Sequence, residues 1–445
     1  MDSFPPVYRL VQHWEQPEIG DVAGAVREAI LSSRLRYRLH PGARVALAVG
    51  SRGIHRIAEM VASAVNTLRE LGAQPFIVAA MGSHGGATPQ GQRELLASYG
   101  VTESAMGVPI RTEMEVVEIG RNSWGEPVYW DRNAYQADAV VTLSRIKPHT
   151  DFRGRYESGV VKMLVVGLGK RLGAETHHKY GVRGLRDLIP ESAKVILGRT
   201  RFALGLAILE NAREHTARVV ALEPEEVLER EPVLLEEARR LMPRIPFAQL
   251  DLLIVGELGK NYSGTGMDVN VLGRQLVEGE RDTLDPTITR ICVLDISPES
   301  HGNAVGVGLA DLTTQRLLEK MDQRVTEVNA LTSCFLLRTK IPHALPNDRE
   351  CLLMGLRTCW QPQLERVRLA IIPNTLQLQT LYITAPLAEE ARRRVQTHDL
   401  PDGVRLEVAD TPIPLPFDAD GNLLQETLFP ESLRAQRNRD RQHVV

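Results

Sequence analysis

Short apolar runs that alternate with amphipathic stretches constrain the fold of this chain more than any other feature of its sequence. Residues 44–50 (RVALAVG) and 75–80 (PFIVAA) are predicted strands, and each precedes a glycine-containing turn and a helix-like pattern. Residues 138–146 (DAVVTLSRI) form a further predicted strand. The order strand, turn, helix, strand is typical of a parallel sheet with crossover helices.

The length of the chain, 445 residues, predicts more than one domain. A charged amphipathic helix is predicted at 224–242, and the sequence MPRIPF that follows it marks a break. We therefore expect a Rossmann-like, parallel-sheet α/β domain at 1–250 and a smaller α/β domain with a polar tail at 251–445. The active site is expected in the cleft between them. The expected helix at 21–36, the further strands at 217–223, 251–259, 290–297, 366–375, 378–385 and 403–410, and the helices at 311–321 and 324–333 complete the interpretation.

Composition and charge exclude several classes of protein. The net charge of -3 gives no indication of a nucleic-acid surface. The N-terminus lacks a basic start followed by an apolar run, and no stretch of about 18 apolar residues predicts a membrane span. The four cysteines form no CxxC pair, which favours reduced thiols and a cytoplasmic protein.

Two histidines follow predicted strands directly. His84 lies in MGSHGGAT, and His149 follows Pro148 after the strand at 138–146. Because the carboxyl ends of parallel strands share one edge of the sheet, the two rings could face each other as an acid/base pair. Each histidine alone could equally be a residue that hydrogen-bonds its own loop. The pair is more informative than either member.

Lys162 and the histidines after it form a second candidate group. Lys162 lies in ESGVVKML, where Ser158 and Gly159 leave room for a ligand and the apolar residues that follow favour a neutral, nucleophilic amine. The alternative is a lysine that extends to solvent. His177 and His178 are adjacent, and adjacent helical residues point about 100° apart, so only one is expected to bind a metal.

Cations surround these candidates. Arg52, beside Ser51 in GSRGIHR, follows the first strand and could bind a phosphate or carboxylate. A run of five cations encloses His149: Arg145, Lys147, Arg153, Arg155 and Lys162. Such a run is usually a solvated face, but here it predicts a pocket for a phosphate-bearing cofactor, an acidic substrate, or both.

The motifs SRGIHR, GSHGGATPQGQRELLASYGV and KPHTDFRGRYESGVVKM, followed by the histidine pair, resemble those of the nickel-dependent lactate racemase family in order and approximate separation. The resemblance covers roughly residues 8–250 and is weaker beyond. It implies a nickel-pincer nucleotide, which is a pyridinium-3,5-bisthiocarboxylic acid mononucleotide carrying nickel. In several members of the family, a lysine thioamide tethers this cofactor.

The resemblance also implies residue roles. His84 and His149 would be the alternate general bases, Lys162 the tether, and His178 the nickel ligand with His177 as the fallback. The further cofactor contacts would be Ser51, Arg52, Ser158 and Gly159. One histidine would take the hydroxyl proton of a 2-hydroxy acid while hydride leaves its α-carbon for the cofactor ring, and the planar 2-keto acid would then be reduced from either face. The implied partners are a small hydroxy acid and the cofactor-synthesis proteins.

The sequence departs from the family's pattern at several positions. The family's motif has two glycines before a small residue and the lysine, whereas the run here is Ser158-Gly159-Val160-Val161-Lys162. The stretch after His149 is also longer. In the second domain, Gly273 and Leu276 stand where the family has glutamine and lysine for the substrate, and Arg274 is a candidate replacement clamp. The predicted substrate-binding residues are Lys147, Arg153, Asp268 and Arg274. These changes predict a hydroxy acid larger or more acidic than lactate.

Two other classes of function remain open from the sequence. His84, His149 and His178 could bind zinc or iron directly in another kind of metal-dependent enzyme. The chain could also be a non-catalytic binder of the nucleotide cofactor or of an acidic metabolite. The sequence leaves open the covalent tether, the choice between His177 and His178, and the oligomeric state.

Overall fold

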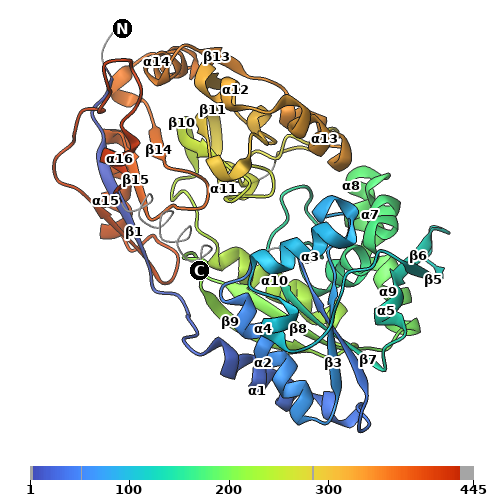
Figure 1. Ribbon diagram of the computed structural model, residues 1–445. Helices are drawn as coiled ribbons and strands as arrows, with labels where there is room; N and C mark the ends of the chain where they lie inside the picture. The colour runs from blue at the N-terminus through green and yellow to red at the C-terminus, as the bar shows by residue number, and fades with distance from the viewer. Residues whose placement is uncertain (1–3, 52, 283–284, 431–445) are drawn as a thin grey trace. The chain divides into compact units, whose positions relative to one another are not determined.

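The computed structural model describes residues 4–51, 53–282 and 285–430. They form two compact units, one at Gln16–Met242 and one that joins the chain up to Glu15 with the chain from Pro243 onward (Figure 1). The first strand, β1 (Tyr8–Trp14), pairs antiparallel with β15 (Thr380–Ile383) and β16 (Val404–Val408) of the second unit. This segment falls within the range expected for the N-terminal domain, 1–250. No local pattern in the sequence reveals pairing partners so distant in the chain.

A six-stranded sheet with the order β4-β3-β2-β7-β8-β9 is the centre of the unit at Gln16–Met242. Its strands are β2 (Arg44–Val49), β3 (Gln74–Ala79), β4 (Ile110–Arg111), β7 (Ala139–Arg145), β8 (Phe202–Glu210) and β9 (Thr216–Leu222). All neighbours are parallel except β8 and β9. The strands β3 and β4, which follow β2 in the chain, lie on one side of it, and the later strands β7 and β8 lie on the other side. The strand order therefore reverses between β2 and β7, and ligands bind at such a switch point in parallel sheets.

The strand β8, with the sequence FALGLAILE, is absent from the expectations above. Eight of its nine residues are buried, so it shows no alternation of polar and apolar positions. A continuous apolar run of this kind cannot be told from a buried helix by periodicity. Its neighbours on the sheet, β7 and β9, were predicted correctly.

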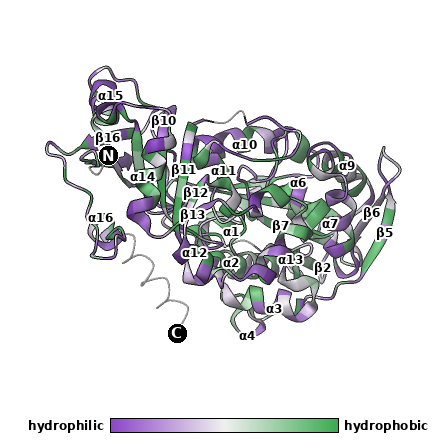
Figure 2. Ribbon diagram, turned by 90° about the horizontal axis from the view of Figure 1, so that it is seen from above, coloured by the Kyte–Doolittle hydropathy of each residue, from purple (hydrophilic) through white to green (hydrophobic). Residues whose placement is uncertain are grey.

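Helices and a hairpin surround this sheet. The longer helices are α1 (Val22–Ser32), α2 (Ile57–Glu70), α3 (Pro89–Ser98), α7 (Lys170–His178), α9 (Ile189–Arg199) and α10 (Val227–Leu241). The short helical segments are η1 (Arg34–Tyr37), η2 (Gly85–Ala87), α4 (Glu103–Met106), α5 (Arg132–Tyr135), α6 (Val160–Lys162), η3 (Met163–Gly167), α8 (Gly181–Arg183) and η4 (Gly184–Leu188), and the hairpin is β5 (Val116–Arg121) with β6 (Pro127–Asp131). The helix expected at 21–36 ends at Ser32, because Ser33 accepts from the backbone N–H of Leu35 and starts η1. The helices carry both hydrophilic and hydrophobic residues (Figure 2), and the apolar faces of α1 and α2 belong to the same buried core as β2, β3, β7 and β8.

The second unit contains an eight-stranded mixed sheet with the order β13-β12-β11-β10-β14-β15-β1-β16. Its other strands are β10 (Gln249–Leu258), β11 (Thr287–Ile296), β12 (Leu312–Thr314), β13 (His343–Leu345) and β14 (Leu369–Ile372). Its helices are α11 (Val269–Leu272), α12 (Gln315–Lys320), α13 (Gln323–Ser333), α14 (Asp348–Thr358), α15 (Ala385–Gln396) and α16 (Gln425–Leu428), with the short turns η5 (Pro298–Ser300), η6 (Val307–Leu309), η7 (Leu336–Thr339) and η8 (Leu364–Arg366). The expected helix at 311–321 is wrong in its first turn, which is the strand β12. The mixed α/β fold class is confirmed.

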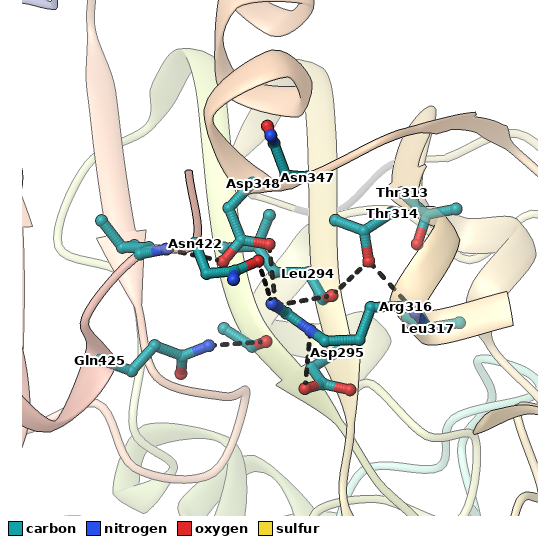
Figure 3. A network of polar contacts seen from close by, with 12 residues as sticks. Leu294, Asp295, Thr313, Thr314, Arg316, Leu317, Asn347, Asp348, Asn422 and Gln425 are labelled. Carbon is teal, nitrogen blue, oxygen red and sulfur yellow. Dashed lines mark hydrogen bonds and ion pairs between the residues drawn. The ribbon is translucent and has the colours of Figure 1, made fainter. Parts of the chain in front are cut away.

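A buried polar network holds the last described segment onto this second unit (Figure 3). Arg316 of α12 donates to Asn422 (2.6 Å) and Asp348 (2.8 Å) and forms an ion pair with Asp295 at 3.1 Å. The other oxygen of Asp348 accepts from the backbone N–H of Leu423 at 2.9 Å. One guanidinium therefore connects α12, α14, the end of β11 and the chain around 422. No helix in the described ranges has the length and apolar character needed to cross a membrane.

Candidate active site

The carboxyl ends of three neighbouring parallel strands carry the predicted residues of the first unit. Ser51 follows β2, His84 follows β3, and His149 follows β7. Because β2 lies between β3 and β7, the two histidine-bearing strands are two strand spacings apart, roughly 10 Å. This edge includes the switch point between β2 and β7. The expectation that the two histidines share one edge of the sheet is met.

A closed loop holds His149. Lys147 and Ser158 exchange two backbone hydrogen bonds, of 3.1 and 3.2 Å, and so close the stretch between them. Inside it, the buried carboxylate of Glu157 accepts from the backbone N–H of His149 at 2.6 Å and from Arg239 of α10 at 2.5 Å. A carboxylate that is desolvated and hydrogen-bonded in this way fixes the backbone that it binds. The loop that precedes Lys162 is therefore a folded unit with its own anchor.

The ring of His149 touches Lys162 directly. Its Nδ1 accepts from the backbone N–H of Asp151 at 3.0 Å, and its Nε2 forms a short hydrogen bond with the Nζ of Lys162. The two side chains are therefore joined by one hydrogen bond, in which either nitrogen can be the donor.

The two valines before Lys162 belong to the core. Both are fully buried, and Val160 packs where Gly205 of β8 has no side chain: a Cβ at Gly205 would lie 3.0 Å from its methyl groups. The valine at position 160, where the family has glycine, is thus accommodated because Gly205 has no side chain. The π-helical turn η3 follows Lys162 immediately, and such turns are frequent at functional sites.

His177 and His178 have different environments. The ring of His177 is buried and uses both nitrogens, with the carbonyl of Gly173 at 2.7 Å and the hydroxyl of Ser192 at 2.9 Å. Burial lowers the pKa of His177 to about 4. His178 donates from Nδ1 to the carbonyl of Ala174 at 2.7 Å. Its Nε2 therefore keeps a lone pair, and this atom has no hydrogen-bond partner among the residues that the structure describes.

The charge state of His178 also suits a metal ligand. Burial lowers the pKa of His178, and the positive charge of Lys162, when protonated, lowers it further. The carboxylate of Asp151 acts in the opposite direction. These electrostatic effects place His178 near Lys162 and Asp151, and therefore near His149. A neutral imidazole with an available Nε2 is the form that binds nickel.

His84 is the exposed member of the set. Its Nδ1 lies 2.5 Å from the hydroxyl of Ser51, so the turns after β2 and β3 are joined through the ring. Its backbone carbonyl accepts from the side chain of Gln92 in α3 at 3.2 Å. Arg52, predicted to bind the cofactor or the substrate, lies outside the described residues.

Gly159 is required by a buried carboxyl group that the sequence analysis missed. A Cβ at Gly159 would lie 2.4 Å from the Oε1 of Glu231 in α10, and the other oxygen of Glu231 accepts from the backbone N–H of Val161 at 2.9 Å. Burial raises the pKa of Glu231 to about 8. A protonated carboxyl group thus supports the start of the turn that carries Lys162. No local pattern marks Glu231, which lies far along the chain in a charged helix.

Three of the predicted substrate-binding residues form hydrogen bonds within the protein. Arg153 donates to the carbonyl groups of His149 and Phe152 and so stabilises its own loop. In the second unit, Arg274 donates to the carbonyl of Leu309 at 2.8 Å and to Asp311 at 3.0 Å. Asp268 caps α11. These three side chains therefore have structural contacts.

The clusters of possible metal ligands are few in the described part of the chain. Across 4–51, 53–282 and 285–430, no group of three or more His, Cys, Asp or Glu side chains is placed to hold a metal ion. A metal that arrives with its own ligands and takes one imidazole fits the available Nε2 of His178.

Together, these features define an α/β protein with a histidine and lysine site at the switch point of a parallel sheet. Residues 9–185 match the family model of the lactate racemase N-terminal domain. The fold is similar to that of the lactate racemase apoprotein from Thermoanaerobacterium thermosaccharolyticum, with 14% identity, a TM-score of 0.52, and coverage of 82% of this chain and 94% of that chain. No curated protein matches the sequence. The part of the chain that carries the predicted motifs is therefore similar to the lactate racemase N-terminal domain.

Proposed function

We propose that this protein is a racemase or epimerase of a 2-hydroxy acid and that it works with a nickel-pincer nucleotide. The observation that carries the proposal is the contact between His149 and Lys162 beside a neutral His178 whose Nε2 is available. A base and an amine that can attach a cofactor are thereby in direct contact, and His178 offers a metal ligand. The match to the lactate racemase N-terminal domain over residues 9–185 supports the reaction class.

Each residue then has a role that follows from its atoms. His178 holds the nickel through Nε2, because its Nδ1 is used by Ala174. Lys162 attaches or positions the nucleotide, with Ser158 and Gly159 at its approach, and Ser51 contacts the cofactor from the turn after β2. Arg52 is a further proposed cofactor contact. When bound, the cofactor supplies a hydride acceptor and donor. His177 has no role at the metal, because both of its nitrogens are used.

His84 and His149 exchange protons with the hydroxyl group of the substrate. They follow strands on opposite sides of β2, roughly 10 Å apart, which leaves room for a small hydroxy acid between them. A base on each side serves one enantiomer each, which is what racemisation needs. The hydrogen bond between the Nε2 of His149 and the Nζ of Lys162 holds the ring of His149 in place.

The substrate proposed is larger or more acidic than lactate. Lys147, Arg153 and the neighbouring Arg145 and Arg155 lie close to His149 in the sequence, and Arg274 and Asp268 are the candidate contacts in the second unit. The guanidinium groups already engaged with carbonyls can be recruited only if an anionic substrate replaces those contacts. We further propose that the protein is cytoplasmic and receives its cofactor from dedicated synthesis proteins.

The test is a racemisation assay on protein produced together with the cofactor-synthesis proteins. Chiral chromatography over a panel of 2-hydroxy acids should show interconversion of the enantiomers of an acid larger or more acidic than lactate. Substrate deuterated at the α-carbon should keep its deuterium, because hydride leaves and returns. Activity on lactate alone would overturn the substrate part, and no racemisation by cofactor-loaded protein would favour a binding protein instead.

Intact-mass spectrometry tests the attachment separately. A mass increase that disappears in Lys162→Ala would establish a covalent tether. Cofactor retained in that variant under native conditions would show non-covalent binding. Arg171→Met, an exposed change on α7, is the matched control.

A further inference from the structure

A buried ion pair lies in the first unit and takes no part in the proposed reaction. Lys170, the first residue of α7, and Asp131, the last residue of β6, are both fully buried, and their charged groups are 3.3 Å apart. Asp131 also accepts from the backbone N–H of Ala134 and caps α5. The pair therefore joins three elements of the unit.

The ammonium group of Lys170 has three polar neighbours. Besides Asp131, it reaches the carbonyl of Ala79 at 2.6 Å and the side-chain oxygen of Gln92 at 3.4 Å. Ala79 is the last residue of β3, and Gln92 lies in α3. A buried lysine is tolerated only when its donors are satisfied in this way.

Gln92 extends these contacts to the loop of His84. Its amide nitrogen donates to the carbonyls of Gly82 at 3.0 Å and of His84 at 3.2 Å. Lys170 thus fixes the backbone where the loop leaves β3, and Gln92 fixes it on both sides of Ser83. The same lysine begins the helix that ends with His178.

This arrangement is costly for a purely structural device. Lys170 has a left-handed backbone, with φ of 53°. Burial lowers the pKa of Lys170 and raises the pKa of Asp131, so desolvation opposes both charges. Apolar residues of similar size often stabilise a core as well as a buried ion pair does. Strain and buried charge are typical of sites that need a fixed geometry.

We propose that Lys170, with Asp131 and Gln92, is a positioning residue that holds the His84 loop in register with the helix that carries His178. The proposal rests on the proposed function for the roles of His84 and His178, but not for the coupling of the two segments. It predicts that the loop and the start of α7 loosen together when the ammonium group is removed.

The experiment uses the full-length protein with the double substitution Lys170→Met and Asp131→Asn. Asparagine keeps the oxygen that caps α5, and methionine fills the volume of the lysine stem, so neither leaves a lone buried charge. Arg171→Met is the matched control, because Arg171 is exposed and next in sequence. The single variant Gln92→Met, which keeps the ion pair, provides a second route to the same loop.

Amide hydrogen exchange and imidazole NMR of the cofactor-free protein are the first readouts. In the double variant and in Gln92→Met, we expect exchange at His84 and Thr88 to rise about tenfold or more, and the His84 ring signals to broaden, while amides of β2 and β8 are unchanged. Unchanged exchange and ring signals in either folded variant would overturn the proposal. If the double variant does not fold, Gln92→Met alone decides.

Racemisation by cofactor-loaded protein is the second readout. Displacement of a base should lower kcat by about tenfold or more with a much smaller change in KM. Loosening of the loop without any racemisation by the wild type would sink the proposed function and leave the positioning role standing. Racemisation by the wild type together with unchanged loop exchange in the variants would overturn the positioning role and leave the proposed function standing.

Discussion

The Nε2 of His149 hydrogen-bonds the Nζ of Lys162, although one residue lies in the loop after β7 and the other in the short helix α6. The bond is possible because Lys147 and Ser158 close the intervening chain and Glu157 anchors it from inside. A base and a potential cofactor attachment point are therefore one hydrogen-bonded unit.

Removal of either general base should impair both directions of the proposed reaction. We expect His84→Gln and His149→Gln each to lower kcat by about 10²- to 10⁴-fold, because each loses proton transfer on one face of the substrate. The measurement is initial racemisation rate from each pure enantiomer. A single variant that racemises within twofold of the wild type would show that its histidine is not a base.

His178 and His177 should separate metal binding from stability. His178→Ala should abolish nickel retention in cofactor-loaded protein and destabilise less than His177→Ala, because it removes one hydrogen bond, to Ala174, instead of two. His177→Ala should retain nickel but lose about 1–3 kcal/mol of unfolding free energy, because a buried ring bonded to Gly173 and Ser192 is removed. Elemental analysis and urea denaturation distinguish the two, and the opposite pattern would assign the metal to His177.

Glu231 should make stability fall as pH rises. Its pKa is raised from 4.5 to about 8 by burial, so folding favours the protonated form. That contribution is complete below pH 4.5 and is lost as pH rises toward 8, with a slope of up to about 1.4 kcal/mol per pH unit. Glu231→Gln should flatten the decline between pH 6.5 and 8, measured by urea denaturation.

The pH range of the measurement matters because the contribution of His177 to stability depends on pH in the opposite direction to that of Glu231. Burial lowers its pKa to about 4, so its contribution is present above pH 6.5 and is lost only as pH falls toward 4. Above pH 6.5 it does not change with pH. If the wild type and Glu231→Gln show equal slopes between pH 6.5 and 8, Glu231 is ionised in the folded protein.

The packing of Val160 against Gly205 should appear as an interaction between two substitutions. Gly205→Ala alone should destabilise by about 1–3 kcal/mol, because its Cβ would lie 3.0 Å from the methyl groups of Val160. Val160→Ala in the same chain should recover part of that loss. A double-mutant cycle by thermal or urea unfolding gives the coupling, and strict additivity would contradict the packing.

Much of the first unit could be predicted from local sequence. The strands at 44–50, 75–80 and 138–146 appear in the structure within a residue or two, because buried parallel strands read as short apolar runs bounded by glycine or proline. His84 and His149 were found for the same reason: residues after such strands lie on the edge where ligands bind. The motifs that resemble lactate racemase lie in these same turns, and the family match over residues 9–185 bears them out.

What the sequence determined is the set of chemical groups and the strand ends that carry them. The tertiary structure decided their states and partners. In the folded chain, His177 hydrogen-bonds Ser192 whereas the Nε2 of His178 stays available, because the two rings point to different sides of α7. The tertiary structure also supplied Glu231, Lys170 and Asp131 from distant segments. Desolvation and close approach act between residues that only the folded chain brings together, so no local pattern encodes them.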